Sequence, residues 1–121
     1  MADEITHNLR LTLANGNLTD LFSPGTIKYT QTTQRKFSVV LNVGTSEESV
    51  TFTDISTPGL CYVYNLDQTN FVKYGKGTAD YFGRSYPNDI PGCLRLDSSV
   101  TTLYLIADTA ACNVLVCVYA A

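Results

Sequence analysis

The residues best suited to catalysis lie near the C-terminus, where Asp108-Thr109-Ala110 follows an apolar run. Aspartic proteases place their aspartate in an Asp-Thr-Gly or Asp-Ser-Gly turn after a strand, and two such carboxylates share a proton. Here Ala110 stands where glycine is needed, and only 13 of the 121 residues follow Asp108, whereas a protease domain needs most of its length after that turn. We therefore expect Asp108 to cap a turn between strands, and we expect no enzymatic activity.

A second pattern, Gly75-Lys76-Gly77-Thr78, is similar to the end of a phosphate-binding loop. The full signature needs another glycine five residues before the Gly-Lys pair, and that position holds Asn70. No helical pattern follows that could direct its N-terminus at a phosphate. The sequence therefore does not favour a nucleotide site.

The remaining ionisable candidates lack partners at useful spacing. His7 lies in the apolar phase of a strand pattern, so we expect a packed or edge histidine. Glu47 and Glu48 lie in a predicted turn without the further oxygen ligands that a divalent ion needs. We expect solvated charges there, with a contact to a basic partner as the alternative.

The four cysteines do not form a recognisable metal or disulfide framework. They are Cys61, Cys93, Cys112 and Cys117, with no C-x-x-C spacing and one histidine in the chain. Cys112 and Cys117 have opposite parity, so on one strand they point to opposite faces. We expect four buried free thiols in a protein made in a reducing cytoplasm, with no metal and no cofactor.

Composition excludes two classes of partner. The net charge is −3 and the basic residues form no cluster beyond Arg35-Lys36, so we expect no nucleic-acid binding. The acidic start, Met1-Ala2-Asp3-Glu4, does not resemble a secretory signal, and no apolar run is long enough for a membrane helix. Charged residues make up 16% of the chain, below the roughly 25% of typical domains. That low value fits a protein partly covered by neighbours, or equally a small domain rich in Thr, Ser and Asn.

The elements that must position these residues are strands. Apolar residues alternate in many short segments separated by turn residues, and no window repeats with a helical period. Residues 18–22 form a short apolar step, which predicts one helical turn ended by Ser23-Pro24-Gly25. We expect one domain over residues 1–121, an antiparallel β-sandwich of jelly-roll type or a small barrel. The expected strands are 5–13, 27–31, 37–43, 50–52, 60–66, 71–74, 79–82, 93–96 and a closing hairpin of 103–107 with 112–121.

Aromatic residues concentrate in the second half, and four candidate contact residues fall in its least regular stretch. Tyr81, Phe82, Arg84 and Tyr86 lie near a short predicted strand and an exposed loop at 84–89. Tyrosine offers a large contact area at low entropic cost and is enriched at protein interfaces. We expect these four residues to contact a partner, with ordinary strand packing as the alternative.

Two stretches carry a family resemblance. The first comprises Gly44-Thr45-Ser46-Glu47-Glu48, Thr57-Pro58-Gly59 and Asn65-Leu66-Asp67-Gln68-Thr69-Asn70-Phe71-Val72, and the second comprises Leu103-Tyr104 and Ala107-Asp108-Thr109-Ala110-Ala111. They resemble segments of small β-rich virion proteins of tailed bacteriophages. The resemblance covers residues 44–121, and its motifs are turns, which specify architecture rather than chemistry.

The resemblance implies a structural virion component, assembled in the host cytoplasm. Within that group we favour a capsid decoration (cement) protein that binds and stabilises the lattice of the major capsid protein. We expect a homo-oligomer, dimer or trimer, in which the terminal strand at 5–13 is exchanged between subunits. The alternatives are a tail, neck or fibre component, and a carbohydrate-binding module with Tyr81, Tyr86 and Asp80 as its platform.

Overall fold

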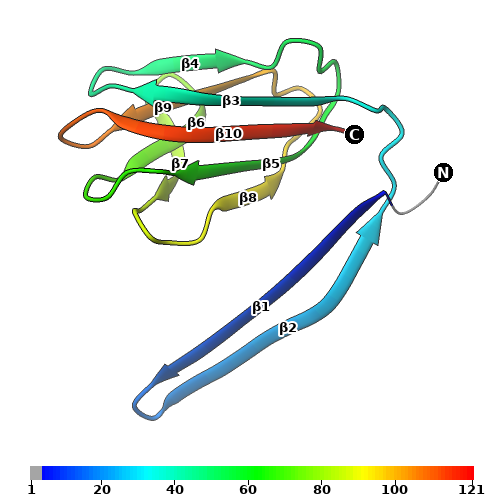
Figure 1. The fold of residues 1–121 in the computed structure, drawn as a ribbon, viewed down its shortest axis with the longest axis vertical. Coiled ribbons are helices and arrows are strands. Elements are labelled where there is room, and N and C mark those ends of the chain that lie inside the picture. Colours follow the sequence, from blue (N-terminus) through cyan, green and yellow to red (C-terminus); the bar gives the residue numbers. More distant parts are fainter. Residues whose placement is uncertain (1–3) are drawn as a thin grey trace. The chain divides into compact units, whose positions relative to one another are not determined.

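The computed structural model describes residues 4–121, and residues 1–3 of the predicted domain range lie outside the described part. All elements of residues 4–121 are strands paired antiparallel, with no helix among them. The all-β prediction is therefore confirmed. The chain divides into two compact units, a two-stranded hairpin and a two-sheet sandwich, with the boundary between Thr32 and Thr33 (Figure 1).

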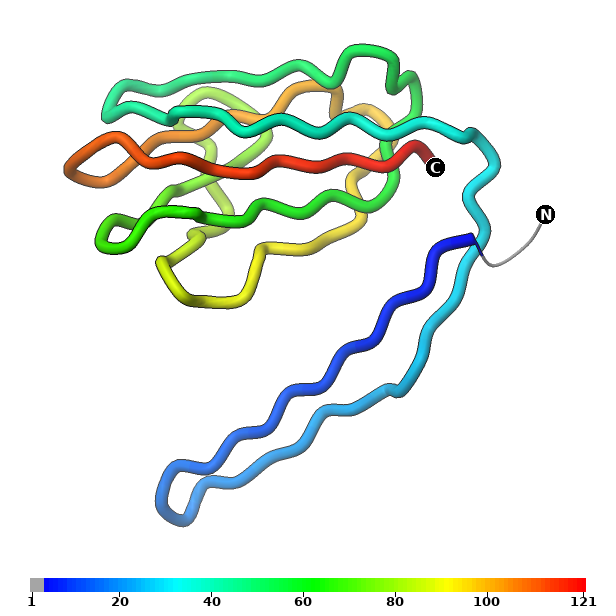
Figure 2. The backbone as a smooth tube through the Cα atoms, in the orientation of Figure 1, coloured from blue at the N-terminus to red at the C-terminus, as the bar shows by residue number. Residues whose placement is uncertain are grey.

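The hairpin pairs β1 (Ile5–Asn15) with β2 (Leu18–Tyr29). Figure 2 shows the two strands running side by side to a tight turn. Asn15 pairs with Leu18, so Gly16 and Asn17 form a two-residue connection, and Gly16 has a φ of +59°. This left-handed conformation is easily adopted by glycine, and short hairpin turns require it.

The prediction of a helical turn at residues 18–22 is wrong, because these residues are the first five of β2. Ser23-Pro24-Gly25 does not end the element but forms a β-bulge: the register passes from Leu9 opposite Gly25 to Leu11 opposite Phe22. Proline cannot donate a ladder hydrogen bond, and bulges are among the few strand positions that tolerate it. The bulge reverses the side-chain phase of β2, so Phe22 and Ile27 lie on the same face despite their odd spacing.

The sandwich has the strand order of a jelly roll, which confirms that part of the prediction. The chain passes repeatedly from one four-stranded sheet to the other (Figure 1). The first sheet has the order β3 (Lys36–Val43), β10 (Cys112–Ala120), β5 (Pro58–Asn65), β8 (Gly92–Arg95). The second has the order β4 (Glu48–Thr51), β9 (Thr102–Ala107), β6 (Val72–Gly77), β7 (Asp80–Ser85).

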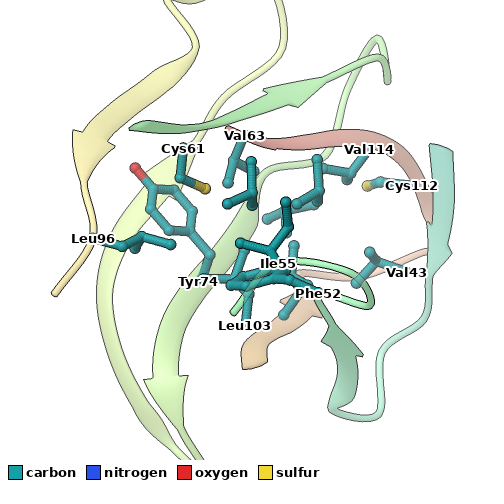
Figure 3. Close-up of a cluster of buried hydrophobic side chains, with 14 of the residues drawn as sticks. Val43, Phe52, Ile55, Cys61, Val63, Tyr74, Leu96, Leu103, Cys112 and Val114 are labelled. Carbon is teal, nitrogen blue, oxygen red and sulfur yellow. The ribbon is translucent and has the colours of Figure 1, made fainter. Parts of the chain in front are cut away.

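The core lies between these sheets because alternate residues of each strand point inward. Cys61 and Val63 of β5 are fully buried, whereas Tyr62 and Tyr64, which alternate with them, point outward. Figure 3 shows the inward side chains of both sheets gathered in one cluster. The buried cluster comprises Val43, Phe52, Ile55, Cys61, Val63, Val72, Tyr74, Leu96, Leu103, Leu105, Ala107, Cys112, Val114, Val116, Val118 and Ala120.

The predicted closing hairpin is wrong. β9 pairs with β4 and β6, whereas β10 pairs with β3 and β5, so residues 108–111 cross from one sheet to the other. A four-residue connection serves a hairpin and a crossover equally well. Strand periodicity does not distinguish the two, because it says nothing about which strand pairs with which.

The cysteine prediction is wrong at one position. All four thiols are free, and Cys61, Cys112 and Cys117 are buried, but Cys93 is exposed. Cys93 lies on the outward face of β8, an edge strand. Burial raises the pKa of the Cys61 thiol to about 12, which keeps it protonated and unreactive.

Candidate interaction surfaces

The four predicted contact residues lie on and just after β7, an edge strand of the second sheet. The expected loop at 84–89 is wrong at its start, because Arg84 and Ser85 belong to β7, which spans Asp80–Ser85. Two register irregularities between β6 and β7 interrupt the regular alternation, so periodicity could not show where this strand ends.

Three of the four predicted residues share one groove. Tyr81, Phe82 and Arg84 line an open groove of about 360 Å³, together with Lys73, Ala79 and Gly83. Phe82 is 54% exposed, and its ring meets that of Tyr74 edge-on, with centroids 5.6 Å apart. Whether these residues contact a partner stays a prediction.

The fourth residue, Tyr86, is connected to the groove through Arg84. The Arg84 guanidinium carbon lies 4.6 Å from the centroid of the Phe71 ring, and Nη1 donates a hydrogen bond of 3.3 Å to the Tyr86 hydroxyl. The rings of Phe71 and Tyr86 lie 5.3 Å apart. Cation–π and aromatic contacts of this kind hold Arg84 in a defined position at the surface.

Glu47 holds the other end of the groove, so the expectation of a merely solvated charge is wrong. Its carboxylate accepts hydrogen bonds from the backbone N–H of Ala79, at 2.8 Å, and from the Tyr81 hydroxyl. The Ala79 N–H, followed by the Tyr81 hydroxyl, holds the pKa of Glu47 below its usual value. The bond to Glu47 raises the pKa of Tyr81 to about 12. The turn before β4 is thereby tied to the β6–β7 turn.

Two cations line the groove. Lys73 and Arg84 lie directly opposite each other in the register of β6 and β7, whereas the Glu47 carboxylate lies at the Ala79–Tyr81 end and already accepts hydrogen bonds from both residues. Like charges directly opposite on a sheet are unfavourable without a counter-charge. In a chain of net charge −3, this groove offers a local site for an acidic group, with aromatic side chains beside it.

A second surface, which sequence reasoning did not identify, is the outward face of the first sheet. Val40, Leu115 and Tyr64 form one cross-strand row, and Val40 is 58% exposed. The alternation of Leu60, Tyr62 and Tyr64 with the buried Cys61 was the available signal, because both faces of this strand carry large side chains.

A third surface is the apolar face of the hairpin. Residues that pair directly share a face, so Leu11 with Phe22 and His7 with Ile27 lie on the same side. The opposite side carries mostly polar residues such as Thr12 and Lys28. The apolar face exposes six large side chains, those of Leu9, Leu11, Leu13, Leu18, Phe22 and Ile27. Leu21 is also exposed but lies on the opposite face.

The motifs that suggested chemistry serve structure. The backbone N–H of Asp108 donates to the carbonyl of Phe71 at 3.1 Å, and the Thr109 hydroxyl donates to the Asn70 side chain at 2.6 Å. Gly75 and Gly77 belong to β6. Within residues 4–121, no cluster of three or more His, Cys, Asp or Glu side chains could hold a metal ion. The same residues include no helix suited to crossing a bilayer.

Of the residues of the alternative carbohydrate platform, Tyr81 lines the groove, Tyr86 packs on Phe71, and Asp80 is not among the lining residues. Whether they bind a sugar stays a prediction. Comparisons with models of known protein families, with curated proteins and with solved structures found no match to this chain.

Proposed function

We propose that this chain is a structural virion protein of a tailed bacteriophage, and that it acts as a capsid decoration protein. In this role it binds the major capsid protein and stabilises its lattice without catalysis. The observation that carries the proposal is the exposed apolar face of hairpin β1–β2, because contiguous apolar surface on a small protein marks association with other protein chains and so a part in an assembly. The contact with the capsid subunit itself is assigned to the groove that Lys73 and Arg84 line.

Two further features support a role in assembly. Jelly rolls are frequent in viral coat proteins as well as in lectins, which is an argument from fold alone. The Lys73–Arg84 groove, with Tyr81 beside it, suits an acidic loop of a capsid subunit. Oppositely charged surfaces steer partners together and select among them.

The test is binding of the purified chain to expanded capsids that lack it, measured by co-sedimentation and by the capsid melting temperature. We expect saturable binding and a raised melting temperature. Lys73→Glu combined with Arg84→Glu should weaken binding at least tenfold, whereas the control Thr51→Glu, at an exposed position of β4, should not.

Immunolabelling of virions decides where the protein lies. Label over the whole shell agrees with a decoration protein, whereas label confined to the tail, neck or fibres would replace this proposal with the tail alternative. Failure to bind capsids, with no label on virions, would exclude a role in the virion.

A further inference from the structure

We infer that the apolar face of hairpin β1–β2 packs on the outward face of sheet β3–β10–β5–β8 of a second copy of this chain, and that two copies exchange hairpins reciprocally. This deepens the proposed assembly role, on which it rests, by naming the surfaces through which the copies associate.

The apolar face of the hairpin needs another element to pack against. A two-stranded hairpin in water is marginally stable by itself, and it gains stability when a face packs against another element. Leu9, Leu11 and Phe22 lie on the same face and are about half exposed. The bulge at Ser23-Pro24 keeps Phe22 in phase with Ile27, so the apolar face continues along both strands. The opposite face is mostly polar, which leaves this face as the one to be buried.

The outward face of the first sheet has the matching character. Leu115 lies between Val40 and Tyr64 in one cross-strand row, and Cys117 lies between Ser38 and Tyr62 in the next. β10 has nine residues and the apolar phase of β1 runs from Ile5 to Leu13, so both faces are roughly 30 Å long at about 3.4 Å per residue.

A second copy is the occupant that covers both faces at once. Each chain carries one hairpin face and one sheet face, and a single contact between copies buries one of each. A hairpin-to-hairpin contact would leave the row of Val40, Leu115 and Tyr64 exposed. The area that one two-stranded hairpin can bury is small compared with the roughly 800 Å² per partner that stable interfaces bury. In a reciprocal exchange each copy contributes both its hairpin face and its sheet face, so the buried area doubles.

Charge complementarity gives the contact a direction. Asp20 lies opposite Leu13, so its carboxylate is on the apolar face near the hairpin tip. The outward face of the sheet carries Lys36 and Arg95 and no carboxylate, and Lys36 lies opposite Tyr119, whose ring its ammonium group overlies at 5.8 Å. Asp20 near Lys36 would place the hairpin tip at the start of β3 in the partner copy.

The experiment measures the molar mass of the full chain in solution by light scattering. We expect the wild type at twice the chain mass of 13.2 kDa. Leu11→Asp, on the hairpin face, and Val40→Asp, on the sheet face, should each halve the measured mass. The matched controls Thr12→Asp, on the polar hairpin face, and Thr51→Asp, on the second sheet, should leave it unchanged.

Mixing the two disrupted variants gives the decisive result, even if the hairpin of Leu11→Asp unfolds. The Val40→Asp chain retains an intact hairpin and the Leu11→Asp chain retains an intact sheet, so an equimolar mixture can form one of the two contacts. Its mass should rise above that of either variant alone as the concentration is raised, with a lower affinity than the wild type. A mixture no heavier than the separate variants, a Val40→Asp chain that stays dimeric, or a monomeric wild type overturns the inference. No capsid is present, so this outcome is independent of whether the protein binds one.

Discussion

Leu11 lies directly opposite Phe22 across the β1–β2 hairpin, and their side chains are 48% and 53% exposed. The pair exists because the bulge at Ser23-Pro24 inserts one extra residue into β2. If the same residues paired without a bulge from Gly25 onward, Phe22 would lie opposite Thr12 on the polar face. The continuity of the apolar face therefore depends on the bulge, which accommodates the extra residue of β2.

Deletion of Pro24 should retain self-association, because it leaves Ser23 opposite Arg10 in regular pairing and keeps Leu11 opposite Phe22 and Leu9 opposite Gly25. Pro24→Ala keeps the residue count and should also retain the doubled mass in light scattering. A monomeric deletion variant would show that an apolar hairpin face of unchanged composition is not sufficient for the contact, which would contradict the packing inferred for it.

Asp20→Lys should weaken self-association, because it places a cation near Lys36 of the partner copy. Exposed ion pairs contribute about 0.2–1 kcal/mol each and the reciprocal dimer holds two of them, so the dissociation constant should rise roughly two- to thirtyfold. The reversed pair, Asp20→Lys with Lys36→Asp, should restore the wild-type value in analytical ultracentrifugation. A double variant as weak as the single one would contradict the proposed direction of the hairpin.

Glu47→Gln should lower stability at neutral pH and have little effect in acid. The folded-state pKa of Glu47 lies below the ordinary value of 4.5. The ionised carboxylate therefore stabilises the folded state fully above pH 4.5, and this stabilisation is lost as the pH falls through the lowered pKa. Urea midpoints of variant and wild type should therefore converge as the pH falls below 4.5 and through the lowered pKa of Glu47. Asp80→Asn, which removes a neighbouring charge and leaves the Glu47 carboxylate in place, serves as the control. A difference between the urea midpoints of Glu47→Gln and wild type that does not change with pH would refute this role of the Glu47 carboxylate.

Asn65→Leu should destabilise the sandwich by about 2–4 kcal/mol, because it leaves buried main-chain groups unpaired. The Asn65 amide donates to the carbonyls of Asn70 and Ser85 at 2.8 and 2.9 Å, and its oxygen accepts the N–H of Asp67 at 2.8 Å.

Ser85→Ala is the matched comparison. The Ser85 hydroxyl is buried without a hydrogen-bond partner among the described residues, so its removal should change stability by less than about 1 kcal/mol. Both free energies come from urea unfolding. Equal costs for the two substitutions would show that the Asn65 bonds contribute nothing particular.

Gly75→Ala should disrupt the groove, because its Cβ would lie 1.9 Å from the carbonyl oxygen of Asp80 and 2.7 Å from Cα of Tyr81. These are backbone atoms, so the β6–β7 turn must move, at a cost of about 1–3 kcal/mol. Gly77→Ala meets only the Asp80 side chain, at 3.8 Å, and should be tolerated. Thermal melts of both variants test this, and equal melting temperatures would contradict it.

The sequence by itself determined which side chains of most strands point inward. The alternation of Phe37, Val39, Leu41 and Val43 with Lys36, Ser38 and Asn42 predicts one inward and one outward face, and the structure has that arrangement. This success has a local cause, because successive side chains of any strand point to opposite sides whatever the strand pairs with. The same reasoning is sufficient for the all-β class.

Only the tertiary structure decided what each strand pairs with. Residues 103–107 and 112–120 are adjacent in the chain but lie in different sheets, and Glu47 meets Tyr81 across 34 positions. The local pattern at Ser23-Pro24 predicts the end of an element, although the bulge there is what aligns Phe22 with Leu11. Strand pairing joins residues far apart in the chain, and its energy depends on both partners together, so no single segment contains that information.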